Sequence, residues 1–199
     1  MAAERAASTA RQKKPSDSEL RRQRLQAARG VKGPTYVDGY YVPERRRNPL
    51  LGSHGRGRIL SAMQRPWYST LPPKGSGVLT TAGRKTGKLH PTCVRVIRKD
   101  NRAYLIAIGG EHSGWLKNIR KNPRVKLRIR GGTFWGTAHE VTDEAEREEF
   151  KDVFIGTFVP FDYMECGFHR RGVPTRAKVV ELHTTWFEHG VPVIIDLPA

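Results

Sequence analysis

Cysteine is almost absent from this 199-residue chain. Its two cysteines, Cys93 and Cys166, lie far apart and form no C-x-x-C pair, so neither a disulfide framework nor a zinc site is predicted. The seven histidines form no H-E-x-x-H motif and no i, i+4 pair on a predicted helix, and we therefore expect no metal centre. A reducing, cytoplasmic location fits these absences best.

Long apolar runs are also missing. No stretch of about 18 consecutive apolar residues occurs, and the N-terminal segment MAAERAASTARQKK has no apolar region of the length that a signal peptide needs. No membrane-spanning segment is therefore predicted.

Acidic residues are scarce relative to basic ones. The chain has 36 Lys and Arg against 19 Asp and Glu, a formal charge of +17, which indicates an anionic partner. Residues 1–58 carry 14 basic and 5 acidic side chains, and hydrophobic content is only 37%. We therefore predict two parts: a basic N-terminal extension at residues 1–58, partly helical or disordered, and a folded domain at residues 59–199.

Within the extension, residues 17–29 favour a short helix, with Ser16 or Asp17 as its N-cap and Gly30 as its stop. Its thin apolar stripe and basic side chains suit the surface of an anionic membrane, so peripheral association with the inner face of the membrane is one hypothesis for the arm. A disordered tail is the alternative.

The domain is rich in strand patterns, joined by hairpins rather than by alternating β-α-β units, with Asp100 and Asn101 forming one tight turn. This favours an α+β fold built on a mostly antiparallel barrel of six or seven strands with flanking helices. Strands are predicted at residues 77–81, 92–98, 102–108, 125–129, 133–141, 178–182 and 191–197, and helices at residues 113–121 and 142–154.

Residues 79–91 (LTTAGRKTGKLHP) are the most informative stretch. A strand runs into a loop that holds two glycines together with Arg84, Lys85 and Lys88, a composition that can cradle an anion. A P-loop is disfavoured because Ala82 and Leu89 replace residues that its motif requires. A hairpin turn with solvated cations is equally compatible with the spacing.

Two further segments could contribute to a site. Gly109 and Gly110 end a strand, and such a pair lets a flat ligand lie against the backbone, although it can also serve only as a turn. Residues 158–168 (FVPFDYMECGF) are predicted to form an aromatic loop, with Tyr163 as a candidate proton donor, and ordinary packing of the loop is the alternative. The chain has no G-x-S-x-G elbow, so a borrowed cofactor is favoured over an internal nucleophile.

Taken together, four motifs in order resemble the deazaflavin (F420)-dependent nitroreductase and quinone reductase family. They are the T-T-x-G-R-x-[ST]-G stretch, the Gly-Gly turn, the W-x-x-N-x-x-x-N-P helix at residues 115–123 and the helix start TDEAEREEF at residues 142–150. The resemblance covers roughly residues 70–199, and its specificity lies in the combination.

The resemblance implies a split β-barrel that binds coenzyme F420, a deazaflavin with a phosphate and an anionic glutamate tail. It also implies hydride transfer to a small-molecule acceptor such as a quinone, an enone or a nitroaromatic compound. Arg84, Lys85 and Lys88 would meet the phosphate and tail, with Thr86 and His90 in the same stretch. Ala107, Ile108, Gly109 and Gly110 would line the ring, and Trp115 and Asn118 would shape that wall.

The chain departs from its relatives at Ala107 and Ile108, where they often carry a Ser-Lys pair, and at His90, where many carry Arg. Flavin mononucleotide (FMN), which related split barrels bind, is therefore retained as the alternative cofactor. A nucleic-acid-binding or scaffold protein is a third interpretation of the charge, disfavoured because the domain's cations concentrate in the cofactor loop. The natural acceptor and the oligomeric state are left open.

Overall fold

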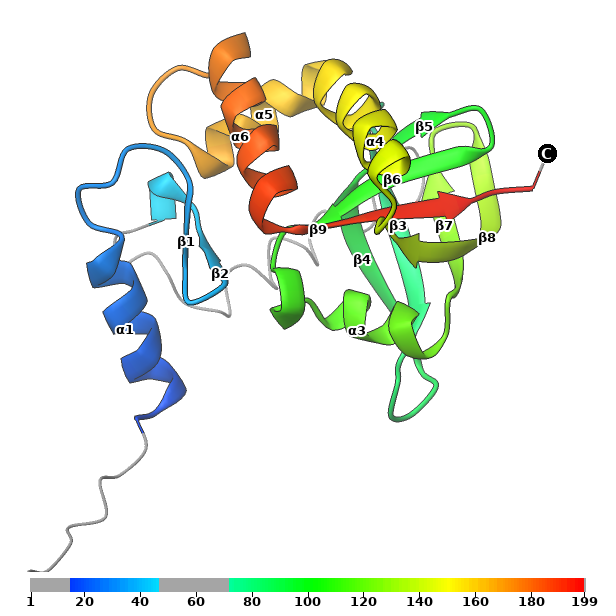
Figure 1. Ribbon diagram of the computed structural model, residues 1–199, viewed down its shortest axis with the longest axis horizontal. Coiled ribbons are helices and arrows are strands. Elements are labelled where there is room, and N and C mark those ends of the chain that lie inside the picture. Colours follow the sequence, from blue (N-terminus) through cyan, green and yellow to red (C-terminus); the bar gives the residue numbers. More distant parts are fainter. Residues whose placement is uncertain (1–14, 47–71, 199) are drawn as a thin grey trace, which may run out of the picture.

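The computed structural model describes residues 15–46 and 72–198 (Figure 1). Near the N-terminus it has α1 (Asp17–Ala27), β1 (Thr35–Val37), β2 (Tyr40–Val42) and the 3-10 turn η1 (Glu44–Arg46). The domain begins with β3 (Ser76–Ala82), β4 (Leu89–Arg95), β5 (Ile97–Lys99), β6 (Arg102–Ala107), η2 (Gly110–His112) and α3 (Gly114–Lys121). It continues with β7 (Arg124–Ile129), β8 (Gly132–Glu140), α4 (Glu144–Gly156), α5 (Pro160–His169), α6 (Arg176–His189) and β9 (Val191–Asp196).

Seven strands form one antiparallel sheet in the order β4-β3-β7-β8-β9-β6-β5. The two edge strands, β4 and β5, are separated in sequence by Val96 alone, so the chain passes directly from one edge of the sheet to the other. This corner is tied down by the Val96 N–H, which donates to the Gly75 carbonyl at 3.0 Å. The sheet therefore curls into a split β-barrel, and the predicted α+β fold is confirmed.

Both faces of the sheet are buried. Leu105 on β6 points into the barrel interior, where it packs in a cluster with Leu127 and, from α3, Leu116. Its neighbours Tyr104 and Ile106 point the other way, into a second cluster formed with α4, α5 and α6. The period of two along the strand thus divides the apolar residues between an inner core and a helix-covered outer core, and Figure 1 shows the three helices layered on that side.

Two sequence predictions are wrong in this helical layer. Residues 178–182, predicted to be a strand, lie in α6, which begins at the N-cap Thr175 and buries Val179, Leu182 and Trp186 at helical spacing. The predicted loop at residues 158–168 is largely α5, which starts at Pro160.

Other predicted elements are confirmed. The tight turn at Asp100 and Asn101 joins β5 to β6, with Asp100 at a φ of 53°. The helix predicted after Ser113 is α3. The next helix, α4, is capped one residue later than predicted, by Asp143, whose side chain accepts from the Glu146 N–H.

The described part of the N-terminal extension is ordered around α1, which confirms the predicted helix. Ser16 is its N-cap and forms a capping box with Glu19. The predicted boundary between residues 58 and 59 lies outside the described residues, so the division into extension and domain stays a prediction. In the described ranges, no helix is both long and apolar enough to cross a bilayer.

Candidate cofactor site

Residues 83–88, called the basic loop from here on, join β3 to β4. The hairpin closes at the paired residues Ala82 and Leu89, and two backbone hydrogen bonds tighten the loop beyond them. The Gly83 N–H donates to the Lys88 carbonyl at 2.8 Å, and the Gly87 N–H to the Gly83 carbonyl at 2.7 Å. Gly87 has a φ of +69°, which favours glycine. The basic loop is therefore a defined turn, not a loose segment.

The side chains of this loop are available to a ligand. Arg84, Lys85, Thr86 and Lys88 are all exposed, and none of the three cations forms an ion pair with a described residue. The main-chain N–H groups of Lys85 and Thr86 likewise donate no hydrogen bond within the described part of the chain. Three cations and two open amides on one turn form a surface that suits an anion with several oxygen atoms.

Asn118, on α3, fixes the basic loop from beneath. Its side chain is buried, its Oδ1 accepts from the Arg84 N–H at 3.2 Å, and its Nδ2 donates to Thr81 Oγ1 at 3.0 Å. Both polar ends of this amide are thus used to hold the loop and the end of β3. Asn118 is a positioning residue in this structure.

The Gly109-Gly110 turn lies at the opposite end of α3, so one short helix connects it to the basic loop. Gly110 has a φ of +48° and accepts from the Ser113 N–H at 2.9 Å. Ile108 and Gly109 are half-buried, whereas Ala107 is fully buried in the inner core. The Ala107 side chain therefore packs into the inner core.

Trp115 and His90 flank these two segments. Trp115 is half-buried and packs against the inner core. His90 is exposed on β4 and lies over the loop, since a Cβ added at Gly83 would come within 2.7 Å of the His90 Nε2. Gly83 is thus needed for close approach of the histidine ring.

Sequence reasoning missed a contribution from the N-terminal extension. The Tyr36 hydroxyl donates to the Ile108 carbonyl at 2.9 Å, which secures the start of the Gly-Gly turn. Tyr40 stacks on His112, with ring centroids 3.6 Å apart and an interplanar angle of 13°, and the Arg24 guanidinium lies 3.8 Å from the other face of Tyr40. Only the aromatic pair at residues 40 and 41 hints at this contact in the sequence.

Tyr163 is not brought to the basic loop. It is exposed on α5, within the helical layer, and Figure 1 shows that layer at the opposite end of the barrel from the β3–β4 hairpin and α3. The structure therefore gathers the loop, α3 and the glycine turn into one region and leaves Tyr163 in another.

A known protein family matches the part of the chain that carries this site. The sequence profile described as F420H(2)-dependent quinone reductase matches residues 59–174, more than half of the chain. That range includes the basic loop, the glycine turn, α3 and α5.

Several solved structures are also similar. An F420-H2 dependent reductase is 18% identical, with 63% of this chain and 97% of that chain covered and a TM-score of 0.45. A conserved hypothetical protein from Mycobacterium tuberculosis is 18% identical over 74% and 82% of the two chains, with a TM-score of 0.40. The heme storage protein HutZ from Vibrio cholerae is 10% identical over 69% and 89%, with a TM-score of 0.41.

Proposed function

Because this chain belongs to the F420H2-dependent quinone reductase family, we propose that it binds reduced coenzyme F420 and reduces an activated small-molecule acceptor: a quinone, an enone or a nitroaromatic compound. The observation that carries the proposal is the basic loop, whose cations have no carboxylate partner among the described residues.

The residues of this region fit the anionic part of F420. Arg84, Lys85 and Lys88 would bind the phosphate and the glutamate tail by charge-assisted hydrogen bonds, and the open N–H groups of Lys85 and Thr86 would add uncharged donors. Asn118 holds the loop through the Arg84 N–H, so none of these groups is used in that contact. An anion bound here would replace solvent around cations that are already held close together.

The ring-side wall would come from the glycine turn. Gly109 is half-buried and presents backbone without a side chain, which suits a flat ring, and the half-buried Ile108 and Trp115 would add apolar edges. Bound F420 supplies the hydride. The chain supplies orientation and shields the ring from water, and the packing of Tyr36 and Tyr40 on this turn would contribute to that shielding.

The sequence made Tyr163 the candidate proton donor, but its place on α5, away from the basic loop and the glycine turn, does not support that role, and solvent is the proposed proton source on the acceptor side. A Tyr163→Phe variant should then keep its turnover number and its affinity for F420. A turnover number at least tenfold lower with several quinones would restore Tyr163 as the proton donor.

The proposal is tested by equilibrium binding of the full chain to F420, to FMN and to a random DNA duplex. We expect selective binding of F420, and at least a tenfold loss of affinity in an Arg84→Ala, Lys88→Ala double variant, because each charge-assisted bond contributes about 1.5–3 kcal/mol. The matched control is Lys99→Ala with Lys151→Ala, which removes two exposed cations on β5 and α4 and should bind F420 as the wild type does.

Each other outcome has a clear meaning. Selective binding of FMN would mean that the barrel carries out hydride transfer with FMN as its cofactor in place of F420. Binding of DNA alone, weakened steeply by salt, would contradict the enzymatic proposal and make the basic surface itself the functional feature.

A further inference from the structure

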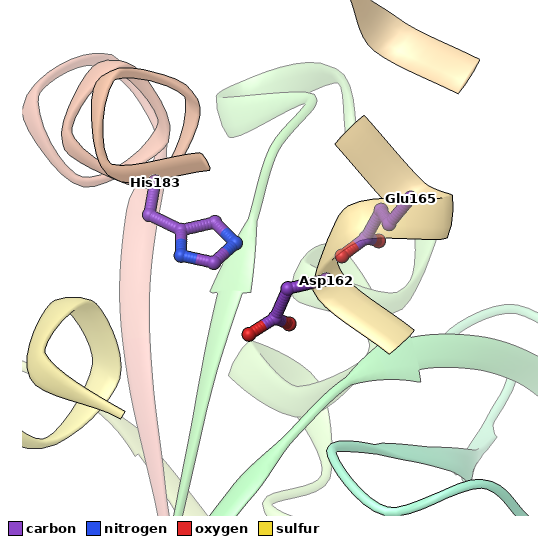
Figure 2. A group of neighbouring side chains, drawn as sticks. All are labelled: Asp162, Glu165 and His183. Carbon is purple, nitrogen blue, oxygen red and sulfur yellow. The ribbon is translucent and has the colours of Figure 1, made fainter. Parts of the chain in front are cut away.

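Three potential metal ligands converge between α5 and α6. Asp162 and Glu165 lie one turn apart on α5, and His183 faces them from α6. Their ligand atoms all lie within 4.8 Å of one another, and Figure 2 shows the three side chains close together, two from α5 and one from α6.

Three polar atoms of this cluster, on His183 and Glu165, are buried without hydrogen-bond partners among the described residues. His183 is fully buried, and neither ring nitrogen forms a hydrogen bond within the described part of the chain. The Oε2 atom of Glu165 is likewise buried and forms no hydrogen bond within the described part of the chain. A buried polar group left unsatisfied destabilises the folded state, so three such atoms in one cluster indicate a missing partner.

Asp162 is already held by Arg95. The Arg95 Nε donates to Oδ1 at 2.8 Å and its second terminal nitrogen to Oδ2 at 3.2 Å, while the Val159 N–H also donates to Oδ2 at 2.9 Å. These three donors orient the carboxylate, as partners of metal ligands commonly do, and leave one lone pair free, on Oδ1. The guanidinium also repels a cation, so we expect weaker binding than at a zinc site without a neighbouring positive charge.

We propose that Asp162, Glu165 and His183 bind a divalent transition-metal ion of the zinc type, which clamps α5 to α6. One imidazole nitrogen and two carboxylate oxygens are ligands that Zn²⁺ accepts, with water as the fourth. Zinc–ligand bonds of about 2.1 Å place ligand atoms roughly 3.5 Å apart in a tetrahedron, so the three groups would close by about an ångström. The site lies in the helical layer, away from the basic loop, and its role is structural.

The sequence carries no signal for this site. Asp162 and Glu165 fall in a segment predicted to be a loop, and His183 follows a segment predicted to be a strand. Helical spacing on α5 and the packing of α6 against it bring the three together, and neither helix is evident from the sequence pattern.

The first test is titration of the chelator-treated full chain with Zn²⁺ alone. We expect one ion per chain and a rise in melting temperature, because a ligand that binds only the folded state stabilises it. Glu165→Gln should weaken binding at least tenfold and abolish the shift in melting temperature. The matched control Glu188→Gln, an exposed carboxylate on α6, should behave as the wild type.

A second measurement keeps the proposal testable if Glu165→Gln folds poorly. In wild-type crystals grown with Zn²⁺, an anomalous difference peak is expected within about 2.2 Å of a His183 ring nitrogen and of both carboxylates. Zinc bound equally well by Glu165→Gln, or found only at exposed histidines such as His90, would overturn the proposal. So would a wild-type chain that binds no zinc, and a proton on Glu165 would then explain the cluster.

Discussion

Asn118 links two parts of the proposed cofactor site, the basic loop and the end of β3. Asn118→Ala removes both hydrogen bonds and leaves the buried Thr81 hydroxyl without its donor. We expect the free energy of unfolding to fall by about 1–3 kcal/mol. We also expect the affinity for F420 to fall, because the Arg84 backbone is no longer held. Urea denaturation and F420 titration measure the two effects.

The control for this prediction is Asn122→Ala, at the C-cap of the same helix. Asn122 is exposed, and its Oδ1 accepts only from the nearby Arg124 N–H at 3.2 Å. A change within about 0.5 kcal/mol is expected. Equal effects of the two variants would mean that Asn118 does not position the loop.

Glu44 ties the N-terminal extension to the helical layer. Its Oε2 accepts from the Arg170 Nε at 3.0 Å and from the Arg171 N–H at 3.1 Å. Burial alone would raise the pKa of Glu44, but these donors outweigh burial and hold the pKa below its usual value of 4.5. The folded state therefore binds this proton less readily than the unfolded state does.

Because the pKa of Glu44 is lower in the folded state, its contribution to stability is complete above pH 4.5 and is lost as pH falls through the folded-state pKa. Glu44→Gln should be less stable than wild type near neutral pH, and the two should converge in acid. Melting temperatures recorded across this range check the prediction, with Glu188→Gln as the control. Parallel curves for Glu44→Gln and wild type would refute it.

At the scale of elements, the β1–β2 hairpin packs against η2 through one layered contact. Tyr40→Ala removes the ring that lies between Arg24 and His112. We expect α1 and the hairpin to be cleaved faster by trypsin, while the barrel unfolds as before, because no core residue is changed. Mass spectrometry of the early fragments identifies where cleavage occurs.

Trp135→Ala is a matched control for the hairpin variant. Trp135 is also an exposed aromatic residue with an arginine over its ring, Arg124 at 5.2 Å, but it lies on β8, outside the extension. Its loss should leave cleavage within α1 unchanged. Faster cleavage of α1 in both variants would mean that the stack on His112 is not what secures the extension.

The elements also show what sequence patterns can predict. Strands with clear apolar runs or alternation, such as β6 and β7, were predictable, as were the hairpin at Asp100 and Asn101 and the basic loop. The strand prediction at the start of α6 is wrong because Val179 and Val180 are β-branched residues, which favour strands. Packing of α6 against α4 and α5 overrides that strand preference. The contact of Tyr36 with Ile108 spans 72 residues, which no local pattern encodes.

At the scale of the whole molecule, charge is shared between the proposed cofactor site and the arm. The basic loop accounts for only three cations, whereas residues 1–30 contain eight Lys and Arg against three acids. Figure 1 shows α1 standing clear of the barrel, and none of its residues is buried. α1 is therefore positioned to meet a second anionic surface without competing for the cofactor.

We predict that this surface is an anionic membrane, and that the full chain co-sediments with vesicles containing phosphatidylserine but not with neutral vesicles. Each Lys or Arg near such a surface contributes about 1 kcal/mol, screened by salt. Deleting residues 1–30, which spares the β1–β2 hairpin, should reduce co-sedimentation at least tenfold and leave F420 binding intact. A truncated chain that still co-sediments fully would place the interaction on the barrel. Loss of F420 binding in the same chain would show instead that α1 supports the cofactor site.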